Sequence, residues 1–157
     1  MKIKLLAVGK MKNPAFAEVA EDYATRIRKY NPLEVVEIPD EKIKTKSDVP
    51  RLLKREADQI RKRLKEGACL IALDEKGIQW TSVDLAWEIK QLLESPAKEI
   101  IFLIGGAEGL DDSIKREAKG LWSLSKLTLP HQLARVLALE QIYRGLTILR
   151  NVPYHNE

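Results

Sequence analysis

Residues 105–110, Gly-Gly-Ala-Glu-Gly-Leu, follow an apolar run and have the composition of a ligand-binding loop. A buried strand that ends in glycines often allows the backbone to approach a ligand closely. The spacing differs from the dinucleotide pattern Gly-x-Gly-x-x-Gly, and no Gly-Lys-Ser/Thr of a P-loop is present. Glu108, Asp111 and Asp112 crowd the start of the next helix, where a phosphate would otherwise bind. The loop therefore favours a nucleoside without phosphates, or one that carries positive charge.

Two further segments are expected to meet this loop at the carboxyl edge of a sheet. One is LDEKG (73–77), interpreted as a tight, charged turn, and the other is WSLSKLTLPH (122–131). In the second, small hydroxyl residues alternate with leucines, so backbone groups could face a base edge while Leu127 and Leu129 flank its face. Each segment alone is more typical of an ordinary strand-to-helix turn. Three such segments together indicate a binding crevice, because open α/β sheets bind ligands beyond the carboxyl ends of their strands.

The histidines and the single cysteine offer little other chemistry. His131 follows a proline at a predicted helix start, where the positive helix end favours a neutral imidazole, and we interpret it as holding the neighbouring loop. Cys69 lies in an apolar run and is interpreted as a small buried residue. One cysteine allows no disulfide framework, so the cytoplasm is the expected location. The spacing of histidine and cysteine matches no zinc site, and we expect no metal.

The elements that must position these residues alternate along the chain. Strands are predicted at 2–8, 33–38, 68–74 and 99–104 from their short apolar runs. Helices are predicted from Asn13-Pro14 to about 29, from Ser47 to 66, from Thr81 or Ser82 to about 94, briefly after 111–112, and from Pro130 to about 149. This alternation indicates an α/β fold of one domain, 1–157, with a mostly parallel sheet covered by helices on both faces. The opening segment is interpreted as a strand rather than a signal peptide, and no run is long enough to cross a membrane.

Positive charge is concentrated in the first part of the chain. Residues 1–70 hold 17 Lys and Arg against 11 Asp and Glu, whereas residues 71–157 hold 10 against 12. The helix predicted over 51–66 places its leucines and isoleucine on one side and most of its basic residues on the other. This basic side could lie along an RNA backbone, or it could be a solvated face with intrahelical ion pairs. The sequence favours neither interpretation over the other.

The segments LIGGAEGL (103–110), WSLSKLTLPHQLARVLALEQIYRG (122–145) and PYHNE (153–157), with the opening KIKLLAVGK, closely resemble the RlmH family of the SPOUT methyltransferases. The resemblance covers essentially the whole chain. It implies a parallel α/β sheet whose C-terminal part forms a deep trefoil knot, and an S-adenosylmethionine pocket built from the three segments. Mapped onto this chain, the resemblance implies cofactor-binding residues at Leu73, Gly105, Gly106, Ser125, Lys126, Leu127, Thr128, Leu129 and Pro130.

The resemblance also implies methylation of N3 of a pseudouridine in large-subunit (23S) ribosomal RNA, on assembled ribosomes, by a homodimer. Loss of the imide proton then calls for a base, or for a cation that stabilises the anion. A Tyr-His pair in the tail is a family feature, so Tyr154 is expected to stack on a base and His155 to accept or steer the proton. Family members often carry a basic residue where this chain has Asn156. Arg135 and Arg144 are therefore the better candidates for contacting RNA or the anion, and we assign the catalytic set to His155, Tyr154 and Arg135.

The last helix fits a dimer interface, because its apolar residues surround too much of it for a single face, although a central core helix explains the same pattern. A second interpretation is a ribosome- or RNA-binding protein that retains the fold without the chemistry. A nucleotide-dependent oxidoreductase is disfavoured by the late position and the adjacent glycines of the 105–110 loop.

Overall fold

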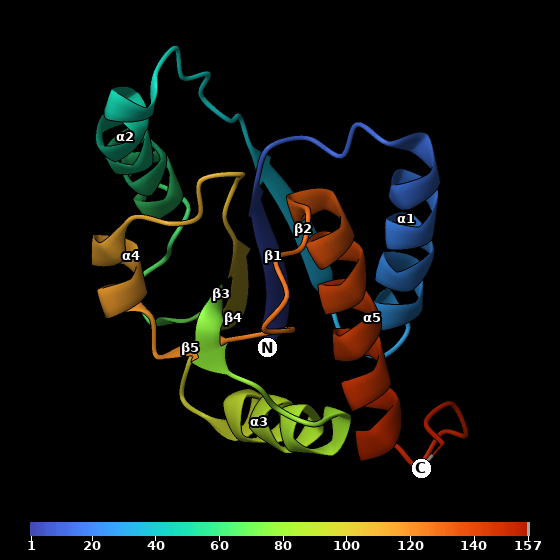
Figure 1. Ribbon diagram of the computed structural model, residues 1–157. Coiled ribbons are helices and arrows are strands. Elements are labelled where there is room, and N and C mark those ends of the chain that lie inside the picture. The colour runs from blue at the N-terminus through green and yellow to red at the C-terminus, as the bar shows by residue number, and fades with distance from the viewer. Residues whose placement is uncertain (157) are drawn as a thin grey trace.

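The computed structural model describes residues 1–156 and is built around a five-stranded sheet with the strand order β2-β1-β4-β3-β5 (Figure 1). Each strand of the sheet pairs in parallel with its neighbours. The strands are β1 Lys2–Val8, β2 Leu33–Ile38, β3 Ala68–Ile78, β4 Glu99–Ile104 and β5 Gly120–Trp122. The helices are α1 Pro14–Arg28, α2 Val49–Arg61, α3 Ser82–Glu94, α4 Asp112–Glu117 and α5 His131–Leu149, and a 3₁₀ turn, η1, spans Lys46–Asp48. The predicted parallel α/β fold is confirmed.

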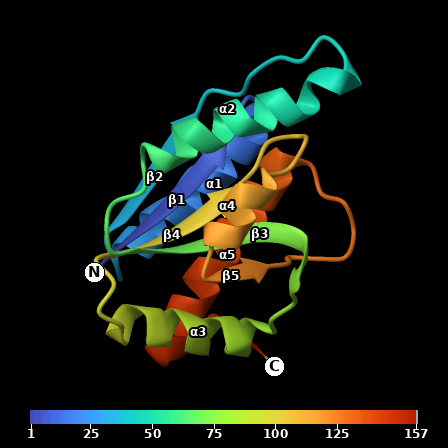
Figure 2. The same cartoon turned by 90° about the vertical axis from the view of Figure 1, so that its left-hand side faces the viewer.

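Helices cover both faces of the sheet, as Figure 2 shows from the side. Successive strand residues point to opposite faces, so β1 sends Ile3 and Leu5 into one apolar cluster and Leu6 into the other. The first cluster is completed by α1, α3 and α5, and the second by α2 and α4. Because both faces are buried, the strands are almost continuously apolar rather than alternating.

Local signals in the sequence explain where three helices begin. The Asn13 side chain accepts hydrogen bonds from the amides of Ala15 and Phe16, with Pro14 in the first turn of α1. At α3, Thr81 and Asp84 form a reciprocal capping box. Helix α5 begins after Pro130, as predicted.

Two predicted elements differ from the structure. Helix α2 ends at Arg61 rather than at 66, because the amides of Arg63 and Leu64 bond to carbonyls three residues back and close the helix in a tighter turn. Ser47 does not cap it and lies instead in η1. The interpretation of residues 73–77 as a tight turn was wrong, because β3 continues to Ile78 through an irregularity in its pairing with β5, where Ile78 pairs with Trp122.

The edge of the sheet at the amino ends of β1 and β4 carries a buried ion pair. Lys4 Nζ lies 3.0 Å from Glu99 Oε2, and both side chains are almost fully buried. This pair joins β1 to β4 near the amino ends of the two strands. The loops singled out in the sequence lie at the opposite, carboxyl ends of the strands.

Two sequence expectations concern features beyond the sheet itself. No helix among residues 1–156 is both long and apolar enough to span a membrane. The trefoil knot that the family resemblance implies stays a prediction.

Candidate functional site

A cavity of about 880 Å³ lies at the carboxyl ends of β3, β4 and β5. Its walls come from the 104–110 segment after β4, the 73–76 part of β3, the 124–130 loop after Trp122, and the first turn of α5 at His131. The crevice predicted from three converging segments is therefore present. Each segment reaches it because parallel strands present all their carboxyl ends at one edge.

The glycines of the 105–110 loop are required first by the loop itself. A Cβ on Gly105 would lie 2.6 Å from the carbonyl oxygen of Gly109, closer than any real contact. Gly109 adopts φ +81°, and its amide donates to the Gly106 carbonyl at 3.1 Å. The close backbone approach predicted here is thus made within the loop, which folds into a tight turn on the cavity wall.

Carboxylates lie on or next to the cavity wall. The Asp111 side chain accepts a hydrogen bond from the amide of Ser113 and caps α4, so the positive end of that helix is already occupied. Asp74 lies in an ion pair with Lys115 at 2.6 Å. Burial raises the pKa of Asp74, but hydrogen bonds from Lys115 and from the Lys76 amide outweigh it, so this pKa is lowered overall and the group is held charged.

Most residues assigned to cofactor binding from the sequence lie around this cavity. Its lining includes Leu73, Gly105, Gly106, Ser125, Leu127, Thr128, Leu129 and Pro130, whereas Lys126 is not among the lining residues. Leu127 is largely open to solvent, with 73% of its surface exposed. An exposed leucine at the mouth of a cavity is suited to covering an apolar part of a ligand.

Arg135 lies away from the cavity. It is only 3% exposed, and its guanidinium bonds to Glu37 Oε2 at 2.5 Å and to the Gly9 carbonyl at 2.9 Å. One turn after His131, it sits on the side of α5 that packs against the ends of β1 and β2. The contact with RNA or with a developing anion predicted for Arg135 is not available to a side chain held in this way.

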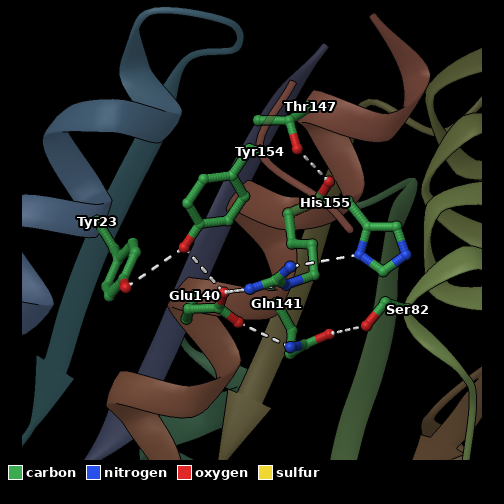
Figure 3. A network of polar contacts seen from close by, with 8 residues as sticks. Tyr23, Ser82, Glu140, Gln141, Thr147, Tyr154 and His155 are labelled. Carbon is green, nitrogen blue, oxygen red and sulfur yellow. Dashed lines mark hydrogen bonds and ion pairs between the residues drawn. The ribbon is translucent and has the colours of Figure 1, made fainter. Parts of the chain in front are cut away.

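Tyr154 and His155 also lie outside the cavity of their own chain. The tail turns back along α5 after Asn151, which has φ 54°, and His155 Nδ1 comes to 3.3 Å from Arg144 Nη1 (Figure 3). Arg144 is thirteen residues after His131 in α5, which at 1.5 Å per residue places it about 20 Å along the helix from the cavity. In this structure the tail therefore lies away from the cavity of its own chain.

Comparison with known proteins gives this arrangement a context. The family model described as "Predicted SPOUT methyltransferase" matches residues 1–155. The chain belongs to the SPOUT methyltransferase family. It is 44% identical over 153 residues, 98% of this chain and 99% of the relative, to a ribosomal RNA large subunit methyltransferase H from Caldicellulosiruptor saccharolyticus. A protein of the same name from Syntrophotalea carbinolica is 42% identical over 156 residues, 99% of each chain.

The fold of this SPOUT chain also resembles a solved structure of low sequence identity. A probable methylase family protein from Haemophilus influenzae aligns with a TM-score of 0.54 and 11% identity, covering 99% of this chain and 70% of that one. The likeness supports the fold assignment alone.

Some cavity residues of this SPOUT chain were given no role of their own from the sequence. Trp122 and Lys115 line the cavity, and Trp122 packs edge-on against Phe102 at 5.8 Å. No local pattern marks the Asp74–Lys115 pair, because its partners are brought together only by the packing of α4 beside the end of β3. Trp122 opens the predicted binding segment 122–131, and its place at the end of β5 brings it to the cavity.

Proposed function

We propose that this chain uses S-adenosylmethionine to methylate N3 of a pseudouridine in large-subunit ribosomal RNA, acting on assembled ribosomes in the cytoplasm as a homodimer. The observation that carries the proposal is the cavity at the carboxyl edge, in a chain that matches relatives named as ribosomal RNA large subunit methyltransferases along nearly its whole length.

The residues around the cavity fit an adenosine sulfonium. Leu73, Leu127 and Leu129 offer apolar contact to a base, while the backbone of 105–106 and 125–130 offers hydrogen-bonding groups. Glu108 adds a carboxylate suited to a cationic ligand, whereas the charge of Asp74 is balanced by Lys115. The capped start of α4 leaves no helix end for a phosphate. When bound, S-adenosylmethionine would supply an activated methyl group, whose carbon bonds to an attacking nitrogen as the C–S bond breaks and S-adenosylhomocysteine leaves.

The chain itself must align the acceptor and manage one proton. We assign acceptor contacts to Tyr154, whose ring can stack on a base, and to His155. Because both lie about 20 Å along α5 from their own cavity, they would act on the cavity of the second subunit. Arg135 is given a positioning role instead, since it joins α5 to the end of β1 through the Gly9 carbonyl.

A basic surface on α2 supports RNA as the partner. Within residues 1–156, Arg55 and Arg61 are engaged with Glu41 and Glu117, so part of the helix forms ion pairs. Exposed basic side chains for which the described residues show no ion pair remain along the same segment, namely Arg51, Lys54, Lys62 and Lys65. Such side chains suit contact with phosphates, which positions a protein on RNA without reading sequence.

The α5 helix gives the homodimer less support than its sequence suggested. Most of its apolar residues pack within the chain, against α1 and α3. Leu137 is the large apolar side chain of this helix that remains exposed, at 37%. The dimer is proposed mainly because the tail cannot reach the cavity of its own chain.

The test is transfer of labelled methyl from S-adenosylmethionine to ribosomes from a strain that lacks the modification, supplied as assembled particles and as separated subunits. We expect N3-methylpseudouridine, identified by mass, from the assembled particles alone. Absence of label in every form of the RNA, together with calorimetric binding of S-adenosylmethionine, would favour the alternative of a ribosome-binding protein that retains the fold.

A further inference from the structure

The cavity wall includes an ion pair that the proposed contacts with adenosine leave without a role. Lys115 of α4 lies with its Nζ 2.6 Å from Oδ2 of Asp74, in the later part of β3. Both residues line the cavity. Lys115 belongs to none of the three segments that were predicted to form the site, so its presence there is a result of tertiary packing.

Asp74 is held firmly and supports the pair. Its Oδ1 accepts a hydrogen bond from the amide of Lys76 at 2.8 Å, and its Oδ2 accepts one from the Lys115 ammonium. The Asp74 side chain is only 10% exposed, whereas that of Lys115 is 28% exposed. Lys115 is therefore the more accessible partner of the pair.

The Lys115 ammonium retains donors for a ligand. An ammonium carries three N–H groups, and Asp74 takes one of them. Asp112 Oδ1 lies 4.0 Å from Lys115 Nζ, which is too far for a hydrogen bond. Within residues 1–156, no other carboxylate forms an ion pair with this ammonium. A partly exposed cation on a cavity wall is suited to bind an anionic group of a ligand.

S-adenosylmethionine has one anionic group, the α-carboxylate of its methionyl end. Its sulfonium and its α-ammonium are both positive, and Glu108 on the cavity wall offers a carboxylate to them. The α-carboxylate instead requires a cation. Attraction between opposite charges is stronger on a partly buried wall than in bulk water, so a cation placed there can contribute to affinity.

Lys76 is the other lysine among the residues that line the cavity. Its side chain is exposed, and in the described part of the chain it forms no ion pair. Such a side chain must be ordered when it binds a ligand, which costs free energy, whereas Asp74 already orients Lys115. The structure therefore favours Lys115 over Lys76 as the partner of the α-carboxylate.

We propose that Lys115, oriented by Asp74, binds the α-carboxylate of S-adenosylmethionine and thereby selects the complete cofactor over adenosine compounds that lack the amino-acid end. The contact rests on the proposed use of S-adenosylmethionine, and it does not depend on the RNA base that is methylated. S-adenosylhomocysteine, the product, keeps the α-carboxylate and binds through the same contact.

Calorimetry with the whole protein tests this contact without any methyl transfer. S-adenosylhomocysteine and 5′-methylthioadenosine share the adenosine thioether and differ in the amino-acid end, so comparing them isolates that end. We expect Lys115→Met to weaken binding of S-adenosylmethionine and S-adenosylhomocysteine by ~10-fold or more, as loss of a hydrogen bond between charged groups does. Its affinity for 5′-methylthioadenosine should stay close to that of the wild type. Lys115→Arg, which keeps the charge, should lose less.

Two further variants separate binding from support of the wall. Asp74→Asn combined with Lys115→Met removes both charges, so that no carboxylate of the pair is left without its partner, and the same selective loss is expected. Lys119→Met is the matched control, because Lys119 is exposed and does not line the cavity. All three affinities should be unchanged in this control.

Equal weakening of all three ligands in Lys115→Met and in the double variant would overturn the proposal, because it would show that the pair only supports the cavity. Unchanged binding of S-adenosylhomocysteine in Lys115→Met would overturn it as well, and so would a selective loss in Lys76→Met instead. Absence of S-adenosylmethionine binding by the wild type would reject the proposed cofactor itself, which distinguishes that result from the others.

Discussion

Gly105 is the residue at which backbone packing most directly controls the cavity. A Cβ here would meet the Gly109 carbonyl oxygen at 2.6 Å, so the 105–110 loop must move to accept any side chain. We expect Gly105→Ala to weaken S-adenosylmethionine binding at least ~10-fold, equivalent to ~1.4 kcal/mol, as measured by calorimetry.

Gly120→Ala is the control for that substitution. Its Cβ would have only an ordinary contact with Ile71, 3.7 Å away, and Gly120 does not line the cavity. The affinity of Gly120→Ala for S-adenosylmethionine should stay close to that of the wild type. Unchanged binding in Gly105→Ala would show that this loop does not contact the cofactor.

Arg135 tests whether a buried arginine near the cavity is structural or catalytic. Arg135→Leu removes the bonds to Glu37 and to the Gly9 carbonyl while keeping apolar volume. Loss of a charged hydrogen bond of this kind should lower the free energy of unfolding by about 2–3 kcal/mol, measured by urea denaturation.

Methyl transfer per folded molecule should change little in Arg135→Leu. The rate must be measured at a temperature where circular dichroism shows the variant fully folded. A fall of more than ~10²-fold under those conditions, comparable to loss of a transition-state donor, would restore the catalytic assignment made from the sequence.

At the scale of elements, the start of α4 links stability to pH. The side-chain hydrogen bond from Ser113 is the main cause of the lowered pKa of Asp111, and its amide adds to it. A carboxyl whose pKa is lower in the folded state stabilises fully above its unfolded pKa, and this contribution is lost as pH falls through the folded pKa.

Asp111→Ala should therefore cost about 1 kcal/mol of unfolding free energy at neutral pH, the usual value of an N-cap, and progressively less in acid. Asp111→Asn keeps an acceptor for the Ser113 amide, so its advantage over Asp111→Ala should not vary with pH. Denaturation at a series of pH values measures both differences. A constant gap between the wild type and Asp111→Ala would show that the charge of Asp111 is not involved.

At the scale of the whole molecule, the separation of tail and cavity predicts a shared site. A Gly105→Arg chain with a blocked cavity still has an intact tail, and a His155→Ala chain still has an intact cavity. After subunit exchange in an equal mixture, mixed dimers have one complete site each, so roughly a quarter of the wild-type sites should recover in a two-fold symmetric assembly. Methyl transfer to ribosomes measures the recovery, and none above the separate variants would place each tail at its own cavity.

The local structure of this chain could be predicted from its amino-acid sequence. The apolar runs, the Asn13-Pro14 and Thr81 starts and the alternation of strand with helix predicted the sheet, because these signals act between residues close in the chain. The segments at the cavity followed from a general property of parallel sheets, whose carboxyl ends share one edge. The motifs at 103–110 and 122–145 identified the family, which the comparisons confirmed.

The contacts between polar groups depend on the tertiary structure and could not be predicted. It paired Asp74 with Lys115, buried Arg135 against Glu37, and brought the tail beside Glu140 and Arg144. Arg135 and His155 were predicted to act in catalysis from residue type and the family resemblance. Neither signal shows which side-chain atoms already bond within the chain. Those contacts join residues that lie far apart in the chain, or join the tail to the helix on which it folds back. Their geometry depends on packing between elements, which no local pattern encodes.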